Sequence, residues 1–255
     1  ISMGQEPVFS PIFCKNFKIK EKSETLAFIL ENVNHLAKKY NCILARFQHS
    51  PLLSDKSNFE YFKEFGYIEA ILYPDWYIFK CKFIYLINLE NDKKILFNKI
   101  RKGHKSNINK SKKILNLHIL DENLFSEELF DKYVEFYFQI KGERRNLMAF
   151  KLDYDAVKSG LQTIMMCEYN NELIGAIALH TFNHSARYNS SAVKHSSIKG
   201  IYPNHFLLWS SILYLKNKKF KLFEIGEQVV ESELYEVNNK EKNLSHFKAG
   251  WGASR

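Results

Sequence analysis

The chain has 255 residues, of which 45% are hydrophobic and 25% are charged, a composition typical of a folded globular protein and unlike that of a long disordered one. This length predicts two domains or one large α/β unit. The formal net charge of +9 favours polyanionic partners such as tRNA, nucleotide diphosphates, coenzyme A or anionic lipid headgroups. The alternative is a lysine-rich composition that reflects no particular partner.

Cysteine usage and hydropathy indicate the compartment. The cysteines show neither a CxxC motif nor paired spacing, so the sequence predicts no zinc site and no disulfide framework. No apolar run is long enough to span a bilayer, and the first residues lack the features of a signal peptide. We therefore expect a cytoplasmic protein whose only membrane contact is peripheral, at the inner face.

The first part of the chain alternates between helical and strand patterns. Apolar residues at helical spacing begin the series, and a strongly basic stretch near residue 100 ends it. In chain order, the predicted elements are a helix over 24–40, a buried strand over 42–45, a short helix ending at Gly66, strands over 67–72 and 77–89, one or two basic helices over 96–113, and a strand over 114–120.

The second part repeats this logic with a longer run of strands. Asn170 and Asn171 lie between two strand patterns and predict a tight hairpin turn. Pro203 suits the first turn of a helix. The predicted elements are helices over 127–139 and 154–161, strands over 163–169, 173–182 and 187–193, a helix over 203–217, and a strand over 220–225.

This layout predicts an α/β (α+β) fold of two domains, residues 1–101 and residues 102–255, joined at the basic helices. The basic segment itself suits phosphate, because several cations on a rigid helix can neutralise a polyanion and release its counterions. A solvated surface is the alternative. The candidate phosphate-binding or tRNA-binding residues are Arg101, Lys102, Lys105, Lys110, Lys112 and Lys113.

The order of elements after residue 163 matches the core of an acetyltransferase. In that fold a glycine-rich loop before the helix binds the pyrophosphate of coenzyme A through backbone N–H groups. The loop here runs over 198–204, and only Gly200 could serve, because Pro203 has no N–H to donate. Ordinary binding of coenzyme A at this loop is therefore in doubt.

The end of the chain places Lys248 two residues before Gly250-Trp251-Gly252. Two glycines permit tight backbone geometry beside a bulky ring, and a lysine in such a place can stabilise an oxyanion or a phosphate. The alternative is a terminal turn with a buried tryptophan and a lysine in solvent.

Three segments together resemble the FemABX peptidoglycan-bridge transferases and related acyltransferases of polysaccharide synthesis. The segments are Lys105-Ser106-Asn107-Ile108-Asn109-Lys110-Ser111, Tyr202-Pro203-Asn204-His205-Phe206-Leu207-Leu208-Trp209, and Phe247-Lys248-Ala249-Gly250-Trp251-Gly252. The resemblance implies tandem acetyltransferase-like (GNAT-like) domains with mixed, largely antiparallel sheets flanked by helices. The first domain looks short for the family and is expected to be incomplete.

The resemblance also implies site residues. Phe247 and Lys248 correspond to the pair near the aminoacyl ester, and His246 adjoins them. The resemblance also implies contacts to the acceptor, for which the local match does not fix the residue of each pair. These are Arg144 or Arg145, Tyr188 or Tyr202, and Asn204. By residue type and position, the candidate general bases are Glu224, Glu227 and His246.

The expected reaction is aminolysis of an ester or thioester, with Lys248 stabilising the oxyanion. The leading hypothesis is transfer from aminoacyl-tRNA to a lipid-linked or nucleotide-linked cell-envelope precursor. The alternatives are acyl-CoA-dependent N-acylation of an amino sugar and a binding module without chemistry. No cofactor is expected beyond the donor. No metal is expected either, because His180 and His184 lack a third ligand at suitable spacing.

Overall fold

The structure is a computed structural model. It describes residues 8–9, 18–42, 47–48, 62–67, 83–142, 145–194, 200–228 and 237–253. The chain folds into two compact units, residues 1–80 with 231–236 and residues 81–230 with 237–255. The predicted boundary between residues 101 and 102 lies later than this one. The reason is that residues 83–100 form a strand and a helix of the second unit's sheet and core.

The first unit contains one long helix, α1 (Ile19–Lys39), and two short parallel strands, β1 (Val8–Phe9) and β2 (Phe47–Gln48). Its described core comprises Leu26, Leu30 and Phe62. The predicted strand over 42–45 begins at a residue, Cys42, that is exposed and not in a strand. The rest of that prediction, residues 43–45, lies outside the described residues, and an acetyltransferase-like fold for this unit stays a prediction.

The second unit is built on a six-stranded sheet in the order β3-β8-β7-β6-β5-β4. Neighbouring strands are antiparallel except for β7 and β8, which are parallel. The strands are β3 (Phe83–Asn88), β4 (Asn116–Leu120), β5 (Gln162–Tyr169), β6 (Glu172–Phe182), β7 (Ser185–Val193) and β8 (Leu222–Gln228).

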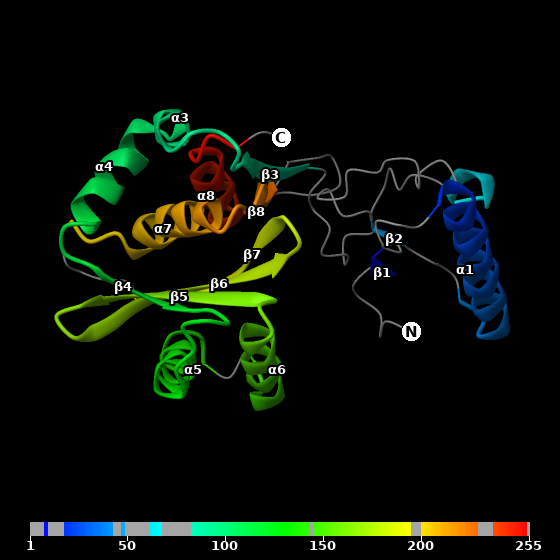
Figure 1. The fold of residues 1–255 in the computed structure, drawn as a ribbon, viewed down its shortest axis with the longest axis horizontal. Helices are drawn as coiled ribbons and strands as arrows, with labels where there is room; N and C mark the ends of the chain where they lie inside the picture. The colour runs from blue at the N-terminus through cyan, green and yellow to red at the C-terminus, as the bar shows by residue number, and fades with distance from the viewer. Residues whose placement is uncertain are drawn as a thin grey trace. The chain divides into compact units, whose positions relative to one another are not determined.

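Helices cover both faces of this sheet (Figure 1). One face carries α3 (Lys93–Lys99), α4 (Lys102–Ser111), α7 (Pro203–Asn217) and α8 (Asn239–Ala249), and the other carries α5 (Glu127–Lys141) and α6 (Leu147–Lys158). Two separate hydrophobic clusters fill the spaces between sheet and helices. This is the layered arrangement expected when one sheet must bury both of its faces.

Local sequence signals account for several of these elements. Asn170 and Asn171 have φ of 49° and 62°, the left-handed pair that a two-residue hairpin turn requires. The predicted hairpin between β5 and β6 is therefore confirmed. Pro203 stands at the first position of α7, also as predicted. Helix α6 begins at Leu147 rather than at the predicted residue 154. The Asn146 side chain caps this earlier start.

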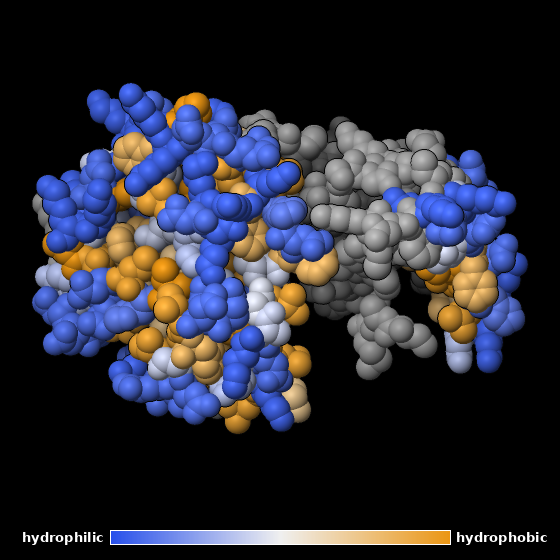
Figure 2. All heavy atoms as spheres, viewed as in Figure 1, coloured by the Kyte–Doolittle hydropathy of each residue, from blue (hydrophilic) through white to orange (hydrophobic). Residues whose placement is uncertain are grey.

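Hydrophilic residues cover much of the visible face of the second unit, including the region of α3 and α4, and apolar residues reach the surface between them (Figure 2). Among the described helices, none is both long enough and apolar enough to cross a membrane.

Candidate functional site

Helix α8 carries the three residues that the sequence placed nearest to the chemistry. The helix begins with a reciprocal capping box, in which Asn238 Oδ1 accepts from Glu241 N at 3.0 Å and the Glu241 carboxylate accepts from Asn238 N at 3.2 Å. The last carbonyls of a helix have no partner inside it, so the last turn of α8 needs donors from elsewhere. That turn carries His246, Phe247 and Lys248.

The start of α4 supplies these donors. Arg101 N donates to Gly250 O at 2.8 Å, and Arg101 Nη2 donates to His246 O at 3.3 Å. His104 Nε2 lies 3.0 Å from Phe247 O. Arg101 Nη1 also lies 2.5 Å from the ring nitrogen His246 Nε2. A cation at a helix C-terminus is stabilised by the helix dipole, so α4 fixes the end of α8 by both hydrogen bonding and charge.

Four rings pack behind this contact, and we call them the histidine cluster: His104, His205, Phe247 and Trp251. His104 Nδ1 lies 3.1 Å from His205 Nε2. The His104 ring centroid lies 5.1 Å from that of Phe247 and 5.3 Å from that of Trp251. His104 is 8% exposed and Trp251 is 2% exposed. The cluster therefore joins α4, α7 and α8 in a largely dry environment.

Both histidines of the cluster favour the neutral form. Burial lowers the pKa of His104; the bond to the Phe247 carbonyl opposes this, while the charges of Arg101 and His246 lower the pKa further. Burial and the neighbouring His104 lower the pKa of His205 to about 4. Both rings are therefore uncharged at neutral pH.

The Lys248 side chain crosses β8 at Gly226. A Cβ added to Gly226 would lie 2.5 Å from Lys248 Nζ and 3.2 Å from Lys248 Cε. Gly226 has a φ of +101°, which disfavours other residues. It sits at a bulge between β3 and β8, where Tyr85 faces Gly226 and Leu86 faces Glu224. The bulge and the missing side chain together make room for the lysine amine.

The glycines on either side of Trp251 are both required by close contacts. A Cβ on Gly250 would collide with the His104 ring, at 2.7 Å from Cδ2. Gly252 has a φ of +69°, and a Cβ there would lie 3.0 Å from the backbone C and O of Lys99. The predicted tight backbone beside the tryptophan is confirmed, and it lets α3 and α4 approach the end of the chain.

The parallel strands β7 and β8 pair only at their starts. The pairing joins Ser185–Arg187 to Leu222–Glu224, and Tyr188 follows directly on β7, half-buried against the same core as α8. Tyr202, the residue before α7, donates its backbone N–H to Ser111 Oγ at 2.8 Å, and its ring packs on His205. Asn204 is exposed in the first turn of α7.

The other predicted acceptor contacts lie apart from this group or outside the described residues. Arg145 forms a two-pronged ion pair with Asp153, at 2.6 and 3.0 Å, and packs on the Phe150 ring. These partners lie on α6, which covers the opposite face of the sheet (Figure 1). Arg144 lies outside the described residues. A role for either arginine in binding stays a prediction.

The candidate bases differ in their surroundings. Glu224 is 4% exposed and its Oε1 lies 3.1 Å from Arg187 Nε. His246 is exposed and contacts Arg101. Glu227 belongs to β8, opposite Ile84, and its side chain lies outside the described atoms.

The predicted phosphate-binding residues form part of the surface of α4 and the turn after it. Lys105 is half-buried and donates to Asn98 O at 3.3 Å, whereas the other lysines of the set project into solvent. The exposed members are Lys102, Lys110, Lys112 and Lys113.

Sequence reasoning missed three residues of the site: His104, His205 and Gly226. His104 was included in the basic segment, yet it lies on the buried side of α4 together with Ile108 and Ser111. Their spacing at positions i, i+4 and i+7 is the signal that could have separated His104 from the lysines. Gly226 ends the apolar part of a strand, a position that often marks a bulge.

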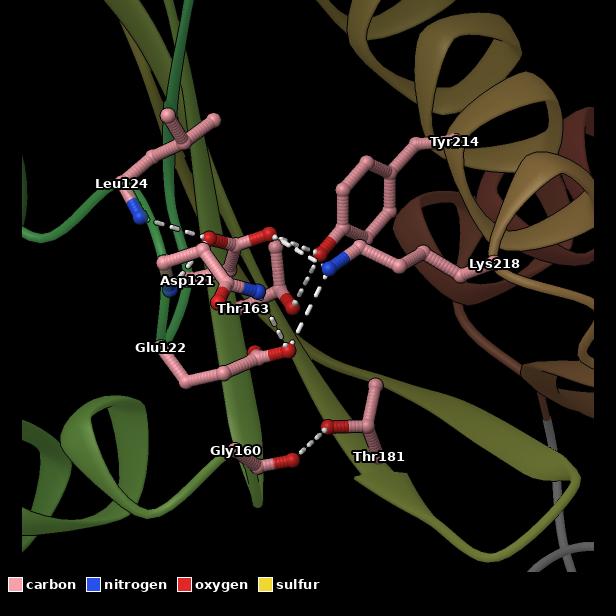
Figure 3. Close-up of polar contacts among 9 residues, drawn as sticks. Asp121, Glu122, Leu124, Gly160, Thr163, Thr181, Tyr214 and Lys218 are labelled. Atoms are coloured by element: carbon pink, nitrogen blue, oxygen red, sulfur yellow. Dashed lines mark hydrogen bonds and ion pairs between the residues drawn. The ribbon is translucent and has the colours of Figure 1, made fainter.

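A second polar group lies at the other end of α7, and we call it the anchor cluster: Asp121, Glu122, Thr163, Tyr214 and Lys218 (Figure 3). Asp121 Oδ2 accepts from Tyr214 OH at 2.7 Å and lies 3.1 Å from Lys218 Nζ. Asp121 Oδ1 accepts from the backbone N–H groups of Asn123 and Leu124, at 2.9 and 2.8 Å.

Both carboxylate oxygens of Asp121 accept hydrogen bonds in the anchor cluster. Asp121 is 1% exposed. Burial alone raises its pKa, but the bonds from Tyr214, Asn123, Lys218 and Leu124 outweigh burial and hold the pKa below its ordinary value. The cluster therefore fixes the turn after β4 to the end of α7, and Asp121 is charged in the folded protein at neutral pH.

The described residues hold no candidate metal site, and the buried cysteine among them is poorly suited to nucleophilic chemistry. No three His, Cys, Asp or Glu side chains among those residues gather closely enough to hold an ion. Cys167 is buried in the core, and burial raises the pKa of its thiol, which opposes nucleophilic use.

Comparison with known proteins found similarity to solved structures but none at the level of sequence. Neither a protein-family model nor a curated protein sequence matches the chain. FemX aligns with a TM-score of 0.68 at 13% sequence identity, over 91% of this chain and 74% of FemX. L-PGS from Bacillus licheniformis aligns with a TM-score of 0.60 at 13% identity, over 91% of this chain and 71% of that one.

A third solved structure agrees with these two. It is the C-terminal domain of a putative lysylphosphatidylglycerol synthetase from Agrobacterium fabrum, with a TM-score of 0.55 at 13% identity, over 88% of this chain and 70% of that one. The chain thus has the fold of FemX and the lysylphosphatidylglycerol synthetases. The mixed α/β fold and the resemblance to FemABX proteins that the sequence predicted are confirmed at the level of the fold.

Proposed function

We propose that the protein is an acyltransferase that moves an aminoacyl group from aminoacyl-tRNA to an amine of a lipid-linked or nucleotide-linked cell-envelope precursor, as in peptidoglycan bridge synthesis. The observation that carries the proposal is the Lys248 amine, held against Gly226 at the end of α8, in a chain with the fold of FemX. Glycine adopts this positive φ without strain, and its missing side chain leaves the space that the Lys248 amine occupies.

The chemistry needs charge stabilisation more than it needs a nucleophile. The acceptor amine attacks the ester carbonyl carbon, a C–N bond forms, and the carbonyl oxygen becomes an oxyanion. The C–O bond then breaks, and the leaving ribose hydroxyl receives the proton that the amine loses. Lys248 supplies a positive charge to the oxyanion, which is the interaction that such reactions depend on most.

The surroundings of Glu224 disfavour it as the group that accepts the proton of the amine. Glu224 is 4% exposed and is ion-paired with Arg187, so an acceptor amine has little access to its carboxylate. His246 and Glu227 therefore remain the candidates for taking the amine proton, alongside the leaving hydroxyl itself.

The start of α7 favours an ester donor over coenzyme A. A pyrophosphate at this helix would need free N–H groups. Tyr202 N already donates to Ser111 Oγ at 2.8 Å, Pro203 has no N–H, and His205 N donates to Tyr202 O at 3.1 Å. These three described positions therefore offer no free N–H to a pyrophosphate, whereas the exposed lysines of α4 offer charge to a nucleic acid backbone.

The test supplies two donors in parallel, aminoacyl-tRNA and acyl-CoA, with a nucleotide-linked muropeptide as the amine acceptor. Transfer from aminoacyl-tRNA is expected, and it should be lost after ribonuclease treatment and weaken steeply as salt rises. Transfer from acyl-CoA that survives ribonuclease would overturn the proposed donor and support N-acylation.

Two further arms test the acceptor and the existence of chemistry. Vesicles containing phosphatidylglycerol replace the muropeptide in one arm, because synthetases of lysylphosphatidylglycerol share this fold. Transfer to the lipid alone would contradict an amine acceptor. Absence of transfer from either donor to either acceptor, with folded protein, would favour a binding module.

A further inference from the structure

The histidine cluster has no assigned role in the transfer reaction, although it contacts the residue before Lys248. We propose that His104 and His205 are positioning residues that hold Lys248 in place, and that the pair loses this role when both rings become charged. The inference rests on the proposed function for its kinetic readout, but the hydrogen-bond arrangement on which it depends can be tested without any substrate.

The positioning argument begins with the Phe247 carbonyl. This oxygen accepts from His104 Nε2 at 3.0 Å and from Gly250 N at 3.1 Å. The peptide group that contains it also contains the backbone nitrogen of Lys248, so the orientation of this peptide sets where the Lys248 side chain begins. No residue of α8 is fully buried, and the Phe247 ring is held by its contacts with His104, His205 and Trp251. The bond from His104 adds a contact from α4 to the peptide that precedes Lys248.

The second step concerns the proton positions. A carbonyl can only accept, so His104 Nε2 carries a hydrogen. If His104 is neutral, its Nδ1 is an acceptor, and the hydrogen between Nδ1 and His205 Nε2, 3.1 Å apart, belongs to His205. Asn107 Nδ2 lies 3.4 Å from the same His205 nitrogen, and with His205 Nε2 as the donor to His104 the Asn107 amide is turned so that its oxygen faces that ring. Both rings therefore carry their hydrogen on Nε2.

Protonation of both rings breaks this arrangement, because a change of tautomer can accommodate a single added proton. With both rings charged, a hydrogen on His104 Nδ1 would face the hydrogen on His205 Nε2, and the two rings would separate or turn. Charge on the pair is also disfavoured by its surroundings, since Arg101 and His246 lie near His104. The charged and titratable groups on the elements packed against the pair include Lys99 on α3, Arg101 and Lys105 at the start of α4, Tyr202 at the start of α7, and His246 and Lys248 in the last turn of α8.

The pH dependence follows from the direction of the shifts. Burial lowers the pKa of both rings, that of His205 to about 4. The neutral pair is therefore complete at neutral pH and is lost as pH falls below the ordinary histidine range. Loss of the pair should reduce kcat rather than raise KM, because it displaces the lysine that acts on the transition state.

The first experiment measures the ring hydrogens directly. Long-range nitrogen–proton NMR spectra of the whole protein at neutral pH should show His104 and His205 both neutral and both protonated at Nε2. A charged His104 at neutral pH, or a His205 protonated at Nδ1 only, would overturn the proposal whatever the enzyme's activity.

The second experiment compares variants that keep or remove the donor. His104→Gln places an amide N–H near the position of Nε2 and should retain most of kcat, with a weaker fall of kcat in acid. His104→Leu removes the donor and should lower kcat by about ten- to a hundredfold, with little change in KM. His118→Gln is the control, because His118 pairs with Glu168 at the distant strand β4.

Equal kcat for wild type and His104→Leu would overturn the positioning role. So would an acid limb that is unchanged in His104→Gln. Either result would leave the proposed function standing, since that function is tested by Lys248 and by the choice of donor. Loss of activity in Lys248→Ala together with unchanged kcat in His104→Leu would separate the two ideas completely.

Discussion

The two ends of α7 carry polar clusters of opposite character. At the C-terminal end, Asp121 is charged and each of its oxygens has two donors, from Tyr214, Lys218 and two backbone N–H groups. At the N-terminal end, the histidine cluster is neutral, and Trp251 Nε1 is buried without a described partner. A charged network in which every hydrogen bond is made stabilises the fold, whereas the neutral histidine pair beside Lys248 can change its hydrogen bonding when a ligand binds or the pH changes.

One substitution applied at each end tests this comparison most strongly. Lys248→Met should lower kcat by about a hundred- to a thousandfold, as expected when a charge on an oxyanion is lost, with unchanged unfolding temperature. Lys218→Met should leave kcat unchanged and lower the unfolding free energy by about 1–2 kcal/mol, because Asp121 loses a partner. Steady-state kinetics and denaturant titration measure the two effects. Comparable loss of kcat in both variants would refute the assignment of a catalytic role to one end of α7 and a stabilising role to the other.

Removal of the buried carboxylate should give the largest effect on stability. Asp121→Ala removes the acceptor of the Tyr214 hydroxyl and of two backbone N–H groups, and leaves the Lys218 amine with Glu122 alone. We expect a loss of about 3 kcal/mol in the unfolding free energy, measured by urea titration, with normal activity per folded molecule. Asp131→Ala, on the exposed side of α5, is the matched control and should change little.

Two glycines with positive φ give a sharper comparison of the ends. Gly226→Ala and Gly160→Ala should each cost about 1 kcal/mol of backbone strain. Only at Gly226 would the new methyl group displace the Lys248 amine, so only that variant should lose activity, by about tenfold. At Gly160 the nearest atom to a Cβ is Glu122 Oε2 at 3.6 Å. Equal activity of the two variants would show that the crossing of Lys248 over Gly226 is not functional.

The smallest expected effect concerns acid. The pKa of Asp121 is lowered in the folded protein, so its contribution to stability is complete above the ordinary carboxyl pKa and is lost as pH falls through the folded value. The difference in unfolding free energy between wild type and Asp121→Asn should therefore shrink as the pH is lowered below about 4. A difference that stays constant with pH would contradict a charged Asp121.

Much of the second unit could be predicted because its signals are local. The hairpin turn at Asn170 and Asn171, the helix beginning at Pro203 and the helix beginning at Glu127 each follow from residues adjacent in sequence. The boundary between units could not be predicted in this way. It depends on β3 pairing with β8, and pairing of distant strands leaves no local signature.

The candidate site divides in the same manner. Lys248 and Phe247 were predicted from a motif of a few adjacent residues that resembles the FemABX proteins. His104 and His205 are separated by 101 residues, and Arg101 and His246 by 145. Their meeting depends on how α4, α7 and α8 pack, which residue identity alone does not reveal. Arg145, which looked like a substrate contact, is paired with an aspartate only eight residues away.

The capping of α8 by α4 has a consequence for the order of folding and for motion. Helix α8 contributes no fully buried residue, and its last carbonyls are held by Arg101 and His104 from far earlier in the chain. Contacts of such long sequence separation close late in folding, and a helix with little buried surface opens at low free-energy cost. Lys248, the residue proposed to stabilise the oxyanion, thus lies on a segment that we expect to join the native structure late and to leave it early.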